Sequence, residues 1–163
     1  MLRILRYAAV IAAIILSASS IAFAQADFED DGTQSQFNGT SAHVCSAGAM
    51  RGVDAGNGAF LCAPLNVSNA IVDAGNQMAF TYNGSSHSVH TCPNNTVMTG
   101  WHKANNWLVC STVAGGLNGS RFTDTGTQEV EPNHQERAIH ACLEGSYMVG
   151  IQDSDDVLIC QSP

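Results

Sequence analysis

The sequence predicts an all-β domain built from three related segments. The 6 cysteines fall into three evenly spaced pairs, and a similar pattern of His, Met and Gly surrounds each pair. No stretch after residue 24 combines an apolar period of 3.6 residues with helix-capping residues. A unit repeated at this spacing is a property of the whole fold, so we expect a pseudo-threefold arrangement of hairpins stapled by disulfides.

The first 24 residues have the layout of a secretory signal peptide. Arg3 and Arg6 precede an apolar run at 7–16, and Ala22 and Ala24 lie at −3 and −1 of a cut before Gln25. The apolar run is about half of the roughly twenty residues that span a bilayer. We therefore expect residues 1–24 to be cleaved. Residues 25–163 would then be a single secreted or periplasmic domain with no membrane insertion.

The composition argues against anionic partners. The chain has 6 Lys and Arg against 14 Asp and Glu, a formal net charge of −8. Cleavage would remove two arginines, leaving four basic against fourteen acidic residues, a net charge of −10. Phosphate backbones and anionic lipids bind basic surfaces, so we expect neither nucleic acid nor a charged membrane as partner.

The cysteine spacing predicts a disulfide pattern. Successive gaps are 17, 30, 18, 32 and 18 residues. Many pairings are open to 6 cysteines, but the alternation favours pairing across the short gaps. The expected disulfides are Cys45–Cys62, Cys92–Cys110 and Cys142–Cys160. Export to an oxidising compartment would allow them to persist.

Two signatures define the repeats, which we place at about 28–70, 71–121 and 122–163. In each block a His lies two residues before the first Cys, and a Met-x-Gly begins twelve residues before the second. These residues are His43, His90 and His140, Met50, Met98 and Met148, and Gly52, Gly100 and Gly150. Upstream of each block is Asp-x-Gly-x-Gln, with Asp30 and Gln34, Asp73 and Gln77, and Asp124 and Gln128.

Each repeat is predicted to form two hairpins. Asn38-Gly39 and Asn83-Gly84 suit the turn of the first hairpin in repeats one and two. The second hairpin runs from Met-x-Gly through a polar turn to the second Cys, and the Gly is expected at a bulge or close approach. Twelve strands follow, a number that fits a β-trefoil, which we rank slightly first, or a three-sheet β-prism.

The Cys…Met-x-Gly…apolar-Cys unit resembles the threefold repeat of β-prisms of the vitelline-membrane-outer-layer type. Those proteins also place a Gly a few residues after the first Cys. The resemblance covers only the three blocks of about twenty residues, and it implies the prism alternative.

Equivalent histidines suggest a metal site. His43, His90 and His140 could meet near a threefold axis and hold Zn²⁺ or Cu²⁺ through three imidazoles. The alternative, which we favour, is that each His forms contacts inside its own repeat. Met50, Met98 and Met148 are expected in the core rather than as copper ligands.

Other candidate ligand-binding residues are polar or aromatic. The Asp and Gln of the repeated signature (Asp30, Gln34, Asp73, Gln77, Asp124 and Gln128) suit sugar hydroxyls, although a local turn explains them as well. Trp101 and Trp107 would stack on a sugar if exposed, but their counterparts in the other repeats are apolar, which favours the core. Asp54 with Asn57, and Asp153 with Asp155 and Asp156, offer oxygens for weak Ca²⁺ binding at hairpin tips.

No sequence motif for nucleophilic, metal-dependent or nucleotide-dependent catalysis is present, so we do not expect an enzyme. The first hypothesis is an exported, lectin-like binding module for carbohydrate or a cell-envelope surface, by fold-level analogy. The second is a periplasmic metal-binding protein that uses the His trio. The third is a structural envelope or matrix protein.

Overall fold

The structure is a computed structural model. It describes residues 28–30, 34–37, 40–54, 59–73, 77–82, 85–102, 105–124, 128–130, 138–152 and 157–163. The predicted signal peptide lies outside the described residues. The described part of the chain is all-β, with fifteen strands and no α-helix. In this part, no helix of the length and hydrophobicity needed to cross a membrane is found.

The strands are β1 (Phe28–Asp30), β2 (Gln34–Phe37), β3 (Thr40–Val44), β4 (Ala49–Asp54), β5 (Ala59–Ala63), β6 (Val67–Asp73), β7 (Gln77–Tyr82), β8 (Ser85–Thr91), β9 (Thr96–His102), β10 (Trp107–Val113), β11 (Phe122–Asp124), β12 (Gln128–Val130), β13 (Ala138–Ala141), β14 (Tyr147–Gln152) and β15 (Val157–Gln161).

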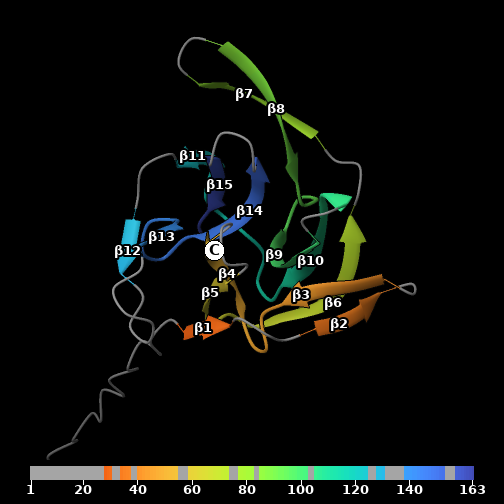
Figure 1. The fold of residues 1–163 in the computed structure, drawn as a ribbon. Helices are drawn as coiled ribbons and strands as arrows, with labels where there is room; N and C mark the ends of the chain where they lie inside the picture. Colours follow the sequence, from red (N-terminus) through yellow and green to blue (C-terminus); the bar gives the residue numbers. More distant parts are fainter. Residues whose placement is uncertain are drawn as a thin grey trace, which may run out of the picture.

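These strands form three five-stranded antiparallel sheets (Figure 1). Sheet 1 has the order β1-β5-β4-β13-β12, sheet 2 the order β6-β10-β9-β3-β2, and sheet 3 the order β11-β15-β14-β8-β7. Each sheet takes three strands from one stretch of the chain and a hairpin from another. The hairpins β2–β3, β7–β8 and β12–β13 project in different directions in Figure 1.

Each hairpin meets its sheet at a contact that we call a seam: seam 1 between β13 and β4, seam 2 between β3 and β9, and seam 3 between β8 and β14. The paired residues correspond between seams: His140 with Val53, His43 with Trp101, and His90 with Ile151. A main-chain hydrogen bond follows in each, from the N–H of Cys142 to Arg51 O (2.8 Å), of Cys45 to Thr99 O (2.9 Å) and of Cys92 to Val149 O (2.7 Å).

The seams explain the repeated glycines. A Cβ on Gly100 would lie 2.5 Å from His43 O and 2.5 Å from Val44 Cγ1. A Cβ on Gly52 or Gly150 would lie almost as close to the hairpin backbone, 2.7 Å from the nearest carbonyl oxygen. The register shifts beside each glycine, between the Met and the Gly in β4 and β14 and opposite them in β9. The predicted bulge and close approach are therefore confirmed.

One hydrophobic cluster receives side chains from all three sheets. It contains Met50, Met98 and Met148, each fully buried, so their predicted core role is confirmed. The strands that carry them, β4, β9 and β14, pack against one another. The inner faces of the three sheets therefore share one core.

The disulfides pair as predicted: Cys45–Cys62, Cys92–Cys110 and Cys142–Cys160. Each links the residue that follows a hairpin strand (β3, β8 or β13) to the strand that ends the same stretch of chain (β5, β10 or β15). Three disulfides are consistent with an extracellular or other oxidising compartment.

The expected number of strands is corrected. The prediction of twelve strands treated the start of each Asp-x-Gly-x-Gln signature as part of a turn. Instead, Phe28–Asp30 and Phe122–Asp124 form short edge strands, and Val67–Asp73 forms a longer one. Each pairs with the strand that carries the second Cys, because that strand would otherwise be a sheet edge.

Candidate functional site: a pocket on sheet 2

A pocket opens on the face of sheet 2 that points away from the shared core. Met98 of β9, and Leu108 and Cys110 of β10, face that core, so Thr99, Val109 and Ser111, which alternate with them, lie on the opposite face of the sheet. The pocket has a volume of about 400 Å³ and is open to solvent. Its lining residues are Val44, Cys45, Ser46, Ala47, Gly48, Leu65, Asn66, Val67, Ala70, Thr99, Val109 and Ser111.

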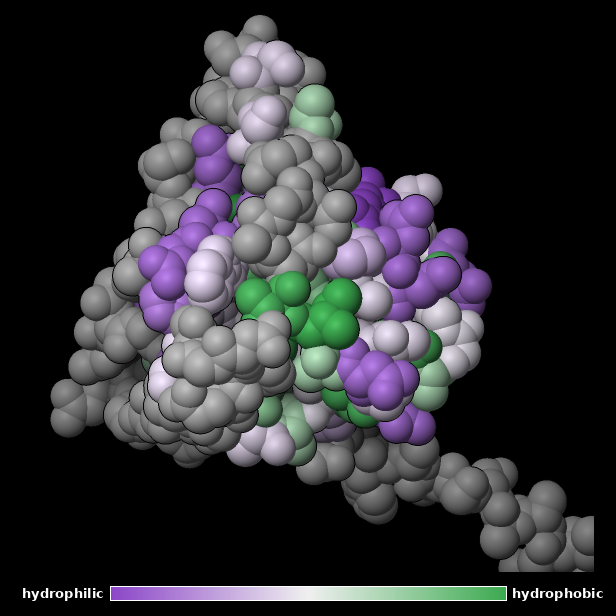
Figure 2. All heavy atoms as spheres, turned by 90° about the vertical axis from the view of Figure 1, so that its right-hand side faces the viewer, coloured by the Kyte–Doolittle hydropathy of each residue, from purple (hydrophilic) through white to green (hydrophobic). Residues whose placement is uncertain are grey.

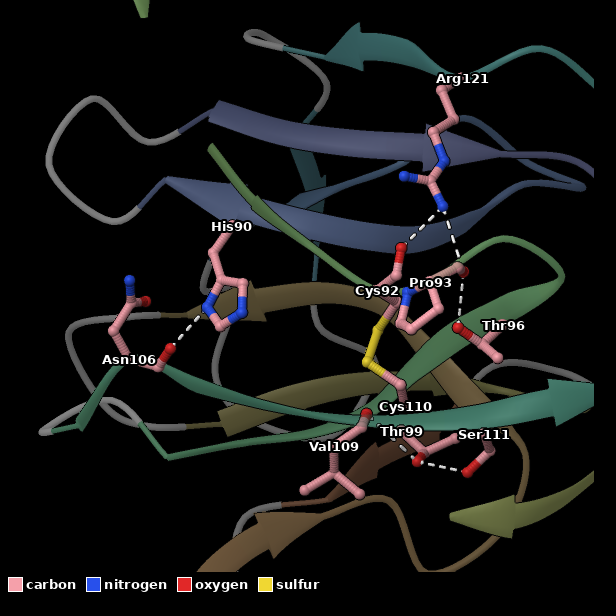
Figure 3. The surroundings of a disulfide bond; sticks show 10 residues. All are labelled: His90, Cys92, Pro93, Thr96, Thr99, Asn106, Val109, Cys110, Ser111 and Arg121. Carbon is pink, nitrogen blue, oxygen red and sulfur yellow. Dashed lines mark hydrogen bonds between the residues drawn. A yellow bond between two sulfur atoms is a disulfide. The ribbon is translucent and has the colours of Figure 1, made fainter. Parts of the chain in front are cut away.

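The base of the pocket carries two buried hydroxyl groups. The Thr99 and Ser111 hydroxyl oxygens lie 2.8 Å apart, and the Thr99 hydroxyl also lies 3.4 Å from Val109 O (Figure 3). Apolar side chains of Val44, Leu65 and Val67 contribute to the lining. The pocket therefore offers hydrogen-bonding groups beside apolar surface, and none of its lining residues has an ionisable side chain.

Strands β6 and β10 lie on the right-hand side of Figure 1, and Figure 2 shows the molecule with that side facing the viewer. A compact hydrophobic patch lies near the centre of this view, with hydrophilic residues beside it. On β6, Ile71 is 48% exposed, although it is a large apolar residue.

The structure does not bring the three predicted metal-binding histidines together. They lie on β3, β8 and β13, in three different sheets. Among the described residues, which include all three, no group of three or more His, Cys, Asp or Glu side chains could hold a metal ion. A three-imidazole site would need the histidines to converge near an axis, and the hairpins that carry them are instead distributed among the sheets.

Two of the histidines contact their own stretch of chain. The ring of His43 stacks on Phe60 of β5, with ring centroids 4.2 Å apart. His90 donates from Nδ1 to the main-chain oxygen of Asn106, just before β10, at 2.6 Å (Figure 3). Each contact links a hairpin strand in one sheet to a strand, or its flank, in another. His140 is also buried.

The two tryptophans differ in position. Trp101 is only 4% exposed and belongs to the shared core, so the core position that we favoured is confirmed, and its side chain is not exposed to stack on a sugar. Its pairing with His43 places it where Val53 and Ile151 lie in the other sheets, and those positions are apolar. Trp107, at the start of β10, is partly buried and lies near His102, with ring centroids 6.0 Å apart.

The repeated Asp and Gln residues lie at corresponding backbone positions. Gln34, Gln77 and Gln128 pair with His43, His90 and His140. Asp30, Asp73 and Asp124 pair with Phe60, Leu108 and Leu158. These pairings place each Gln beside a His, and the sugar-binding role of these six residues stays a prediction.

The predicted calcium sites fall mostly outside the described residues. Asp54 ends β4 and is partly buried. Asn57, Asp153, Asp155 and Asp156 belong to the tips that the structure does not describe.

The pocket was not predicted from the sequence. Its polar residues, Ser46, Asn66, Thr99 and Ser111, form no motif, and nothing in the spacing separates them from ordinary surface residues. The one available signal was the alignment of the blocks, in which Thr99 corresponds to Arg51 and to Val149.

No model of a protein family, no curated protein and no solved structure matches the chain.

Proposed function

We propose that this protein is an exported, non-catalytic binding module for a component of a cell-envelope surface, and that the pocket on sheet 2 is its ligand site. One observation carries the proposal, namely an open pocket of about 400 Å³. Pockets of roughly 300–1,000 Å³ are typical of sites for small ligands. The hydroxyls of Thr99 and Ser111 and the nearby main-chain groups would hold a ligand, whereas no lining side chain is suited to transferring protons.

The scaffold we propose is a pseudo-threefold, β-prism-like domain. The sheets share one strand order, and their inner faces share one core, which supports a prism over the trefoil that we ranked first from the sequence. In such a scaffold, corresponding positions of the three sheets can form different binding sites when their side chains differ. Fold-level analogy alone suggests carbohydrate as a ligand class, since sugar hydroxyls match hydroxyl and carbonyl partners.

The alternative functions receive less support. Metal binding by the His trio requires three imidazoles at one place, and these lie on three sheets. A structural envelope or matrix role needs no pocket, so we keep it as the interpretation that follows if the binding experiment gives no signal.

The proposal is tested by measuring binding of the oxidised protein to a glycan array and to isolated envelope fractions. Ala47 is exposed at the pocket, so Ala47→Trp should obstruct the pocket without disturbing the core. Thr112→Trp is the matched control, because Thr112 is exposed on β10 but does not line the pocket. We expect Ala47→Trp to weaken binding at least tenfold and Thr112→Trp to leave it unchanged. Binding that is absent, or equal in both variants, would refute this site.

A further inference from the structure

In two of the three seams, a buried or partly buried arginine donates a hydrogen bond to the carbonyl group of the corresponding cysteine. In seam 1, Nη1 of Arg51 donates to the carbonyl oxygen of Cys142 at 2.7 Å, and Arg51 is only 5% exposed. In seam 3, Nη2 of Arg121 donates to the carbonyl oxygens of Cys92 at 2.7 Å and Pro93 at 3.2 Å (Figure 3). Both cysteines are the first of their disulfide pair.

The described groups that hydrogen-bond Arg121 are all neutral and polar. Its Nε donates to Oε1 of Gln161 at 3.3 Å, and Nε2 of Gln161 donates to the carbonyl oxygen of Gly119 at 2.7 Å. Burial lowers the pKa of the Arg121 guanidinium, because desolvation disfavours the charged form. Main-chain carbonyls and an amide oxygen thus hold the guanidinium.

Seam 2 has the same framework with short side chains in both arginine positions. Thr99 lies between Met98 and Gly100, as Arg51 lies between Met50 and Gly52. Ala70 precedes Ile71, which pairs with Cys110, as Arg121 precedes Phe122, which pairs with Cys160. Ser111 follows Cys110, as Gln161 follows Cys160.

The short residues and the corresponding acceptors all line the sheet 2 pocket. Cys45 and Ser46 correspond to Cys92 and Pro93, which accept hydrogen bonds from Arg121 in seam 3. Ala70, Thr99 and Ser111 also line the pocket. The pocket therefore occupies the place that arginine side chains fill in the other two sheets.

We infer that the sheet 2 pocket binds the guanidinium group of an arginine side chain supplied by a partner polypeptide. The inference rests on the proposed function, since it uses the same pocket and names its ligand chemistry. A guanidinium offers five N–H donors in a planar fork, which matches carbonyl and hydroxyl acceptors arranged as around Arg121. Val44, Leu65 and Val67 would cover the aliphatic stem.

The overall charge favours such a partner. The chain carries 14 acidic against 6 basic residues, so its long-range field attracts cations and speeds their association. Arg51 and Arg121, which fill the corresponding places in the other two sheets, belong to the polypeptide itself. A solvent-open pocket is accessible to an arginine that projects from another chain.

The test uses capped peptides and the oxidised full chain. Acetyl-Gly-Arg-Gly-amide is titrated against the Lys and citrulline counterparts and free arginine, with NMR shifts of the Ser46, Ala70 and Ser111 amides as readout. We expect the Arg peptide to shift these amides and to bind at least tenfold more tightly than the Lys and citrulline peptides. Equal binding of all three, or binding of free arginine alone, would overturn the inference.

Ala70→Arg supplies the guanidinium from within the chain, and Ala70 is exposed, so the substitution is compatible with folding. It should abolish binding of the Arg peptide, while the matched Thr112→Arg should preserve it. Equal loss of peptide binding in both variants would show that the added positive charge alone weakens binding, and it would overturn the inference. If saccharides shift the pocket amides and arginine peptides do not, the guanidinium inference fails but the proposed function stands. If neither does, both fail.

Discussion

Single glycines determine how closely each hairpin can approach its neighbouring sheet. At Gly100, a Cβ would lie 2.5 Å from both His43 O and Val44 Cγ1, a distance at which backbone must move. We expect Gly100→Ala to lower the free energy of unfolding by about 1–3 kcal/mol, the usual cost of overpacking. Urea unfolding of the oxidised protein measures this loss.

The matched control is Ser68→Thr, which also adds one carbon atom but at an exposed position of β6. Its effect should stay within about 0.5 kcal/mol. Equal stability of both variants would show that β3 does not lie against Gly100 as described.

The buried hydroxyl pair in the pocket gives a second prediction at this scale. Thr99→Val removes one hydroxyl and leaves the Ser111 hydroxyl, 3% exposed, without that partner. An unsatisfied buried hydroxyl costs about 1–3 kcal/mol, whereas removing both members is nearly neutral. Urea unfolding should therefore show the double variant Thr99→Val/Ser111→Ala to be more stable than Thr99→Val alone. Strictly additive losses would contradict the pairing.

The role of a single residue could be predicted from the sequence where its neighbours along the chain determine that role. The cysteine pairs and the glycines at the seams follow from local spacing. The histidines do not, because equivalent residues enter different sheets when the hairpins are distributed. The pocket was hidden for a related reason: Thr99 and Ala70 have meaning only beside Arg51 and Arg121, whose main-chain contacts appear only in the folded structure.

At the scale of elements, the disulfides hold the hairpin strands to their own stretch of chain. Cys45 follows β3 of sheet 2, and Cys62 lies on β5 of sheet 1, so this bond links two sheets. Closing a loop of this length stabilises a fold by roughly 3 kcal/mol in the chain-entropy model. We expect Cys45→Ala/Cys62→Ala to lose about 2–5 kcal/mol of unfolding free energy in urea.

The control for this prediction is peptide mapping of the unreduced protein. It should recover three crosslinked peptide pairs, each within one stretch of chain. A crosslink between stretches would contradict the described arrangement, and a loss of stability below about 1 kcal/mol would contradict the expected stabilisation.

The sequence predicted hairpins better than edges. Turn residues and alternating patterns indicate where a chain reverses, but β1 and β11 have only three residues each. Segments so short carry no periodicity, and their pairing with β5 and β15 is decided by the unpaired edge that those strands would otherwise present.

At the scale of the whole molecule, the distribution of hairpins makes each stretch of chain depend on the others. Residues 64–121 contain β6 to β10, yet β9 pairs with β3 and β8 pairs with β14, both outside that fragment. The shared core likewise draws side chains from all three sheets. No single stretch can therefore bury its own apolar face without strands from the others.

We therefore expect a fragment of residues 64–121 to be unfolded as a monomer, although it retains its own disulfide, Cys92–Cys110. The measurements are far-UV circular dichroism, amide dispersion by NMR and mass by ultracentrifugation, with the full chain as control. Assembly into a folded trimer would agree with the distribution of hairpins among the sheets, because three copies of the fragment can supply one another's hairpins. A folded monomer would contradict it, since β8 and β9 would then need no partner strand from outside the fragment.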